Sequence, residues 1–240
     1  MSPRCSYLPV LLVACEVASI PLPEPRSQQL ALQASPDAPP GTKPRMEQHF
    51  ADSVRIKDAV IAGKLADLRA PALRLRERSE DDPAAWRPFI DANVRRADEL
   101  LVAKDLNAAA VAAAGLARTC GDCHATSLGP VFPARVAPAI TTRDPRQRMR
   151  RHQWAADRLW EAMVAHSDSA WQAGADALND PALARADYPS EVEIEDDPIV
   201  VEHQLAALGK RAASARDWDD RLLVYGGFLA TCAACHEQGR

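Results

Sequence analysis

The chain has 240 residues, of which 47% are hydrophobic and 26% are charged, and its formal net charge is −4. It therefore lacks the basic excess that nucleic-acid-binding domains use, and we expect no nucleic-acid partner. Its length is enough for one large domain or two small ones, although an aromatic content of 5% is low for the cores of two small domains.

The first 15 residues are predicted to form a signal peptide. One arginine precedes an apolar run from Tyr7 to Ala14, which is typical of a secretory signal and is too short to span a bilayer as a helix. The sequence LVAC at residues 12–15 resembles the bacterial lipobox, after which the cysteine is lipidated. We therefore expect an exported lipoprotein that is anchored through Cys15 and faces the periplasm or the cell surface. An ordinary cleaved signal, a misassigned start codon and a disulfide between Cys5 and Cys15 are the alternatives.

Residues 16–44 are predicted to be a proline-rich linker. Nine of the nineteen prolines lie in residues 1–45, and no helical period runs from Ile20 to Pro44. Such a segment cannot bury a core and behaves as an extended spacer. A spacer that directly follows an anchoring cysteine suits a tethered domain.

Apolar residues then recur at helical spacing in two blocks, residues 45–126 and 146–240. The predicted helices cover residues 45–62, 65–78, 83–103 and 106–121 in the first block and 146–166, 168–179, 198–215 and 218–233 in the second. Asp82-Pro83 and Asp197-Pro198 are predicted helix starts, because aspartate caps a helix and proline fits its first position. Residues 127–145 carry four prolines and form a predicted connector, and residues 191–194 are expected to be a loop. The expected fold is all-α, with two tandem four-helix bundles.

Four of the six cysteines lie in two C-x-x-C-H motifs, Cys120-Gly-Asp-Cys123-His124 and Cys232-Ala-Ala-Cys235-His236. This pattern is the attachment signature of c-type haem: two thiols one helical turn apart bond the porphyrin vinyl groups, and the adjacent histidine binds the iron. A thioredoxin-like dithiol should instead open a helix after a strand, and a Cys₄ zinc site leaves the histidines unexplained. We therefore expect two covalently bound haem c groups, with His124 and His236 as proximal iron ligands.

An internal repeat appears when the two motifs are aligned. The ungapped alignment pairs residues 103–106 with 215–218 and Thr119 with Thr231. We interpret the chain as one module that is present twice. His166 and His203 have no counterparts in the first block, and we expect them to be surface or structural residues.

The first predicted helix of each block begins with Met-x-x-His and carries an apolar stripe at helical spacing. The two stripes are Met46, His49, Ser53, Ile56 and Val60, and Met149, His152, Ala156, Leu159 and Met163. A buried imidazole needs a partner, and in an up-down-up-down bundle the start of the first helix lies beside the end of the fourth. We therefore expect His49 and His152 to be the sixth iron ligands. The alternatives are ligation by the methionines, a histidine bonded only to backbone, and an open sixth position.

The position of each motif, near the end of the last helix of its block, resembles the class II cytochromes c, the cytochrome c′ group of four-helix bundles. Class I cytochromes c instead carry the motif near the N-terminus. The resemblance covers about three quarters of the chain and implies haem attachment at both cysteine pairs, with His124 and His236 as proximal ligands. The Met-x-x-His starts and the duplication depart from the group, whose distal face is usually open or apolar, so its gas binding does not carry over.

The predicted function is electron transfer. Two six-coordinate haems leave no place for a substrate at iron, so we expect an electron carrier rather than an enzyme, with redox proteins as its partners. The alternative is a protein that binds nitric oxide, carbon monoxide or peroxide at an open iron. The positions of His49 and His152 on the stripes favour the electron carrier. The sequence also has no serine-histidine-acid order, phosphate loop or H-E-x-x-H motif.

The lipobox leads to a test of membrane attachment. In a bacterial host that processes lipoproteins, Cys15→Ala should release the protein from the membrane, because the acyl chains are attached at that thiol. Cell fractionation and the intact mass of the mature N-terminus measure this. A wild-type chain that begins at another residue and carries no lipid contradicts the prediction.

Overall fold

The computed structural model describes residues 31–32, 40–126, 129–141, 144–183 and 198–238, and most of these are helical. The all-α prediction is therefore confirmed. The predicted signal peptide, most of the linker and the predicted loop at residues 191–194 lie outside the described residues. None of the described helices is both long and apolar enough to cross a lipid bilayer.

The described elements follow the predicted helices closely. In chain order the first set comprises β1 (Ala31–Leu32), α1 (Thr42–Ile61), the 3₁₀ helix η1 (Leu65–Leu68), α2 (Arg69–Leu75), η2 (Ala84–Trp86), α3 (Arg87–Val102) and α4 (Leu106–Thr126). The second set comprises β2 (Pro130–Val131), α5 (Pro145–Ala165), α6 (Asp168–Leu178), η3 (Pro181–Leu183), α7 (Pro198–Ser214) and α8 (Trp218–Gln238). The two short strands pair antiparallel. Both α4 and α8 run five residues beyond the predicted ends, so each C-x-x-C-H motif lies within a helix.

The predicted helix start at Asp82-Pro83 is wrong. Pro83 has φ −55° and ψ 140°, which is extended backbone, and α3 begins only at Arg87 after a 3₁₀ turn. The Asp82 carboxylate instead accepts a hydrogen bond from the Ser79 N–H (3.0 Å) and pairs with Arg45 of α1. It therefore closes a loop and does not cap a helix. Pro198 does open α7 as expected, while Asp197 lies outside the described residues.

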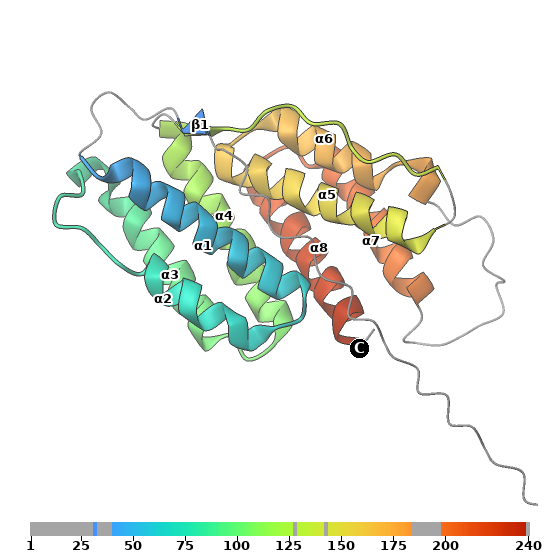
Figure 1. Cartoon of the computed structure of the whole chain (residues 1–240), viewed down its shortest axis with the longest axis horizontal. Helices are drawn as coiled ribbons and strands as arrows, with labels where there is room; N and C mark the ends of the chain where they lie inside the picture. Colours follow the sequence, from blue (N-terminus) through green and yellow to red (C-terminus); the bar gives the residue numbers. More distant parts are fainter. Residues whose placement is uncertain (1–30, 33–39, 127–128, 142–143, 184–197, 239–240) are drawn as a thin grey trace, which may run out of the picture.

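Helices α1–α4 form one group and α5–α8 a second, and α4 and α8 lie side by side between them (Figure 1). The two central helices run antiparallel. At one end Arg118 lies 3.7 Å from Asp219, and further along a Cβ on Gly226 would lie 3.7 Å from Ala114 and from the Val111 backbone. Because α4 is rich in alanine, it combines a high helix propensity with small side chains that allow this close packing.

The stripes predicted on α1 and α5 face the interior. Their central residues are at most 2% exposed: Ser53, Ile56, Val60, Ala156, Leu159 and Met163. The largest fully buried side chains, in contrast, all belong to the second group: Trp160, Trp171, Tyr225 and Phe228. The Tyr225 hydroxyl donates to the Ala156 carbonyl (3.0 Å), which joins α8 to α5.

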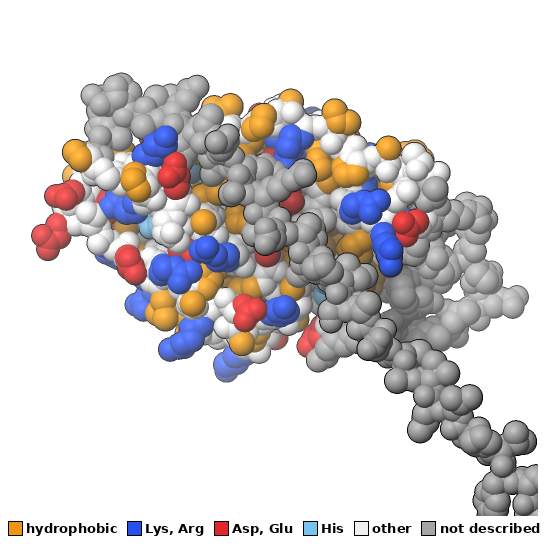
Figure 2. All heavy atoms as spheres, in the orientation of Figure 1, with side chains coloured by type: hydrophobic (Ala, Val, Ile, Leu, Met, Phe, Trp, Pro, Cys, Tyr) orange, Lys and Arg blue, Asp and Glu red, His pale blue; other side chains and the backbone are white. Residues whose placement is uncertain are grey.

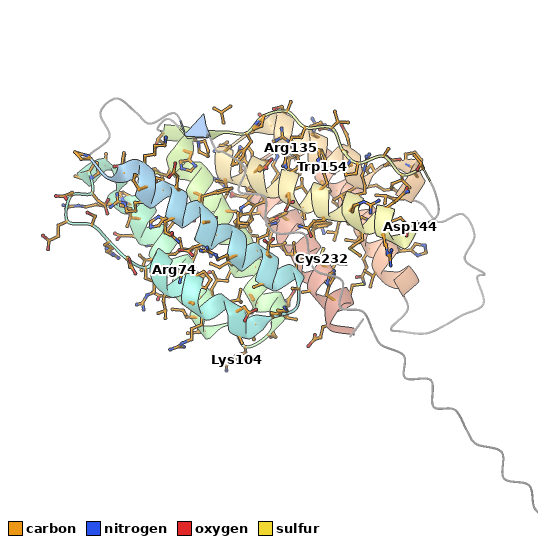
Figure 3. All side chains as sticks on the ribbon, viewed as in Figure 1. Arg74, Lys104, Arg135, Asp144, Trp154 and Cys232 are labelled. Carbon is orange, nitrogen blue, oxygen red and sulfur yellow. The ribbon has the colours of Figure 1, made fainter. Side chains whose placement is uncertain are left out.

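The segment between α4 and α5 packs along α5 (Figure 1). Arg158 of α5 donates to the Pro133 carbonyl (3.2 Å), and Arg151 donates to the Pro138 carbonyl (2.8 Å). Arg135 of the segment, labelled in Figure 3, pairs with Glu161 of the same helix. The predicted connector is therefore bound to the second group over much of its length.

Residues that the repeat aligns make equivalent local bonds in both groups. An aspartate accepts from a backbone N–H at the start of α4 and of α8, and a threonine donates to the carbonyl four residues earlier. The four bonds are Ala108 N to Asp105 (2.7 Å), Asp220 N to Asp217 (2.8 Å), Thr119 to Gly115 O (2.9 Å) and Thr231 to Gly227 O (2.9 Å). The chain also adopts positive φ after α1 at Gly63 (69°) and after α5 at His166 (53°), which are aligned positions.

One charge on α1 is fully buried. Asp52 is 0% exposed, and its carboxylate accepts hydrogen bonds from Arg74 (Nε at 2.9 and 3.1 Å), Gln48 (3.0 Å) and Arg55 (2.8 Å). Burial works to raise the pKa of this carboxyl, but the hydrogen bonds from Arg74, Gln48 and Arg55 outweigh it and hold the pKa below its ordinary value. The cluster ties α1 to α2 beside the interior stripe.

Replacing Asp52 tests this cluster. Asp52→Asn should lower the free energy of unfolding at pH 7 by about 1.5–3 kcal/mol, because hydrogen bonds to a charged acceptor are lost. Because folding lowers the pKa of Asp52, its charge stabilises the folded state at pH values above the unfolded pKa of about 4. This stabilisation is lost as the pH falls through the folded-state pKa. Urea unfolding at pH 7 and pH 3 should therefore show a smaller difference at pH 3. The exposed control Glu47→Gln should change little, and equal losses at both pH values contradict the assignment.

Candidate functional site

The first C-x-x-C-H motif borders a cavity. Cys120, Cys123 and His124, near the C-terminal end of α4, all line a cavity of about 90 Å³. The two thiols and the imidazole of the motif therefore border one shared space.

The cavity walls are mainly apolar and come from every helix of the first group. The apolar lining consists of Met46, Phe50, Leu75, Trp86, Phe89, Ile90, Pro130 and Val164. The charged pair of Arg45 and Asp82 and the carboxylate of Glu77 also border it. Val164 belongs to α5, so the second group contributes to this wall as well.

His49 of α1 lines the same cavity as His124, so the structure brings these two predicted residues together. Burial, with a smaller contribution from the positive charge of Arg45, lowers the pKa of His49. A lowered pKa favours the neutral imidazole, which is the form that binds metals. Met46 lines the cavity too, so the alternative methionine ligand of this block also lies at the site.

The ring of His124 is held by a hydrogen bond. Its Nδ1 lies 2.7 Å from the Val164 carbonyl oxygen. A carbonyl only accepts, so Nδ1 carries the proton and Nε2 keeps the lone pair. Histidines that bind metals usually donate their second ring nitrogen in this way, which fixes the tautomer and the ring orientation.

The thiols of the motifs lack the features of a redox dithiol. Burial, assisted by the neighbouring thiols Cys123 and Cys235, raises the pKa of Cys120 and of Cys232 to about 12. Reactive dithiols instead have lowered pKa values and sit at the N-terminal end of a helix. Both motifs here lie near the C-terminal end. The thioredoxin-like alternative therefore does not fit this geometry.

The cysteine pairs are too far apart for one Cys₄ zinc site. Because α4 and α8 are antiparallel and Arg118 is level with Asp219, Cys120 and Cys232 are separated by roughly 20 Å along the helix axis at 1.5 Å per residue. Within the described ranges, no three side chains of His, Cys, Asp or Glu form a group that could hold a metal ion.

The second predicted site draws on α5 and α8. The N-terminal end of α5 and the C-terminal end of α8 point to the same side of the second group (Figure 1), and Figure 3 labels Cys232 on α8. Burial, assisted by the charge of Arg148, lowers the pKa of the half-buried His152 to about 4. Met149 is 45% exposed and His236 is exposed. In the first site, Glu77 and Asp82 border the cavity. The segment of the second block that corresponds to residues 77–82 falls within residues 184–197, which lie outside the described residues.

Sequence reasoning missed several residues of the first cavity. Trp86, Phe89 and Asn93 come from η2 and α3, which carry no motif. Arg45 could have been found, because it directly precedes Met46 and the same Arg-Met pair recurs before His152.

No known protein family, curated protein or solved structure matches the chain.

The raised thiol pKa values can be checked on protein produced without haem. Iodoacetamide reacts with the thiolate, so at pH 8 Cys120 and Cys232 should be alkylated at least about a hundredfold more slowly in the folded chain than in urea. A time course of peptide masses measures both rates, and the urea sample is the control. Equal rates in the two samples contradict the burial of these thiols.

Proposed function

We propose that this chain is a dihaem c-type cytochrome that transfers electrons. One haem is attached at Cys120 and Cys123 and the other at Cys232 and Cys235, and α1–α4 and α5–α8 are tandem four-helix bundles of the cytochrome c′ type. The protein is exported and tethered to a membrane through Cys15, and its partners are redox proteins. It carries electrons and is not an enzyme.

One observation carries the proposal: His49, Cys120, Cys123 and His124 all line one cavity. These residues fit a haem. Two thiols one helical turn apart would suit covalent attachment, and the imidazoles of His49 and His124 would be available to bind the iron. The aromatic and aliphatic walls match the apolar, flat body of a porphyrin.

Bound haem supplies a one-electron redox couple, and the residues of the chain hold it in place and adjust its properties. Proton donation from His124 Nδ1 to the Val164 carbonyl leaves Nε2 as the nitrogen that binds iron. Burial keeps His49 neutral and therefore able to bind iron. The apolar walls keep water away, which is one of the ways in which a protein sets a haem potential.

The second haem site is supported by the repeat. Cys232, Cys235 and His236 occupy the same place on α8 as the first motif does on α4. The equivalent bonds in the two groups support a duplicated module. His152 lies half-buried near the start of α5, the position that corresponds to His49 on α1.

Ligation by two histidines favours an electron carrier. An iron with two imidazole ligands keeps no open position for a substrate or a gas. The small-ligand alternative requires at least one open iron, and it is the contrary outcome of the experiment below.

The experiment combines haem counting with histidine replacement. A pyridine haemochrome assay on wild-type protein should give two haems per chain. His49→Ala should convert one haem to a high-spin form that binds carbon monoxide, and His152→Ala should do the same to the other, because each loses its sixth ligand. His203→Ala, at an exposed position on α7, is the control and should change neither spectrum. Rapid carbon monoxide binding at both haems of the ferrous wild-type protein supports the open-iron alternative, and fewer than two haems per chain refutes the dihaem proposal.

A further inference from the structure

The C-terminal end of α5 crosses the first C-x-x-C-H motif at very short range. Gly121 lies between the two cysteines, and a Cβ at this position would lie 2.1 Å from the Met163 carbonyl oxygen. Real Cβ atoms do not approach backbone oxygens so closely, so only glycine permits this crossing. The aligned residue in the second motif is Ala233, whose carbonyl oxygen would lie 3.6 Å from a Cβ on Gly63, the residue after α1 that the repeat aligns with His166.

Two histidine–carbonyl contacts lie at this crossing and run in opposite directions between the helices. His124 of α4 donates to the Val164 carbonyl of α5 (2.7 Å). The Nδ1 atom of His166, directly after α5, lies 3.3 Å from the Gly121 carbonyl of α4. The end of α5 therefore contacts the motif at both its glycine and its histidine.

The end of α5 is itself held in place. The His166 ring lies edge-on to Trp218 with centroids 4.2 Å apart, and Arg221 lies over the same indole at 4.2 Å. One turn earlier, the buried Glu161 accepts from Arg158 (2.9 Å) and pairs with Arg135 of the connector. The Val164 carbonyl is therefore a rigid acceptor.

We propose that α5 serves both haem sites: its first half carries His152 for the second site, and its last turn positions His124 for the first. Val164 is thus a positioning residue that acts through its carbonyl, and the first site is incomplete without the second group. This inference rests on the proposed function. Donation of the Nδ1 proton makes the imidazole a stronger ligand, which favours ferric iron and lowers the potential of the first haem.

Gly121→Ala tests the proposal, because the added methyl group forces α5 away from the motif. In a redox titration of the full-length protein, the first haem, identified as the one that His49→Ala alters, should favour the ferrous state about tenfold more. This is a rise of about 59 mV for a one-electron couple. The second haem should not change. Gly226→Ala is the matched control, because its Cβ meets only ordinary contacts at 3.7 Å in another helix pair. A first-haem potential in Gly121→Ala equal to that of the control overturns the proposal.

His166→Gly is a second variant that leaves the motif intact. Glycine accepts the positive φ of this position, as Gly63 does after α1, but it removes the ring contacts with Gly121 and Trp218. The proposal is supported if the potential of the first haem rises by less than in Gly121→Ala and the potential of the second haem does not change. An unchanged first-haem potential in His166→Gly overturns the proposal. This result decides the question even if Gly121→Ala fails to attach haem.

Failure of the proposed function is recognised separately. A wild-type protein without haem refutes the cytochrome assignment whatever the variants do. The contact between α5 and the motif is then judged in the haem-free protein by the ¹⁵N shifts of His124. A tautomer protonated at Nδ1 in the wild type that is lost in Gly121→Ala supports the positioning role, and identical shifts in the two proteins overturn it.

Discussion

The close antiparallel packing of α4 against α8 is the constraint on which the rest of the structure depends. Small alanine side chains of α4 lie at the contact, such as Ala114, which faces Gly226 of α8. Because each helix carries its C-x-x-C-H motif near its C-terminal end, antiparallel packing sends the two motifs to opposite ends of the molecule. The remaining helices of the first group enclose the cavity beside the first motif, and no single site can use both cysteine pairs.

A charge buried between α1 and α5 adds a second constraint. Lys57 of α1 is 2% exposed and pairs with Asp157 of α5 and with Asp58 (2.7 Å). Burial acts to lower the pKa of Lys57, but the two carboxylates outweigh it and keep the amine charged. A buried charge recovers its desolvation cost only when its partners are well placed. It therefore favours one placement of α1 against α5, the two helices that carry His49 and His152.

The two groups fill their interiors differently. An aromatic content of 5% is low for the cores of two small domains. In the structure, the second group buries Trp160, Trp171, Tyr225 and Phe228 in side-chain packing, whereas Phe50, Trp86 and Phe89 of the first group border the cavity. Figure 2 shows charged side chains of both signs scattered over the face that it displays, without a patch of one sign.

The sequence by itself determined the helices, their order, the buried stripes on α1 and α5 and the cysteine motifs, because helical spacing and short motifs are local properties. The helix start predicted at Asp82 is wrong, because an ion pair with Arg45 and an extended Pro83 outweighed a local capping preference. Only the tertiary structure decided that α5 crosses the first motif at Gly121 and that His166, expected to be a surface or structural residue, contacts it. These contacts join residues more than forty positions apart. They depend on the crossing of two helices, and no local pattern encodes that crossing.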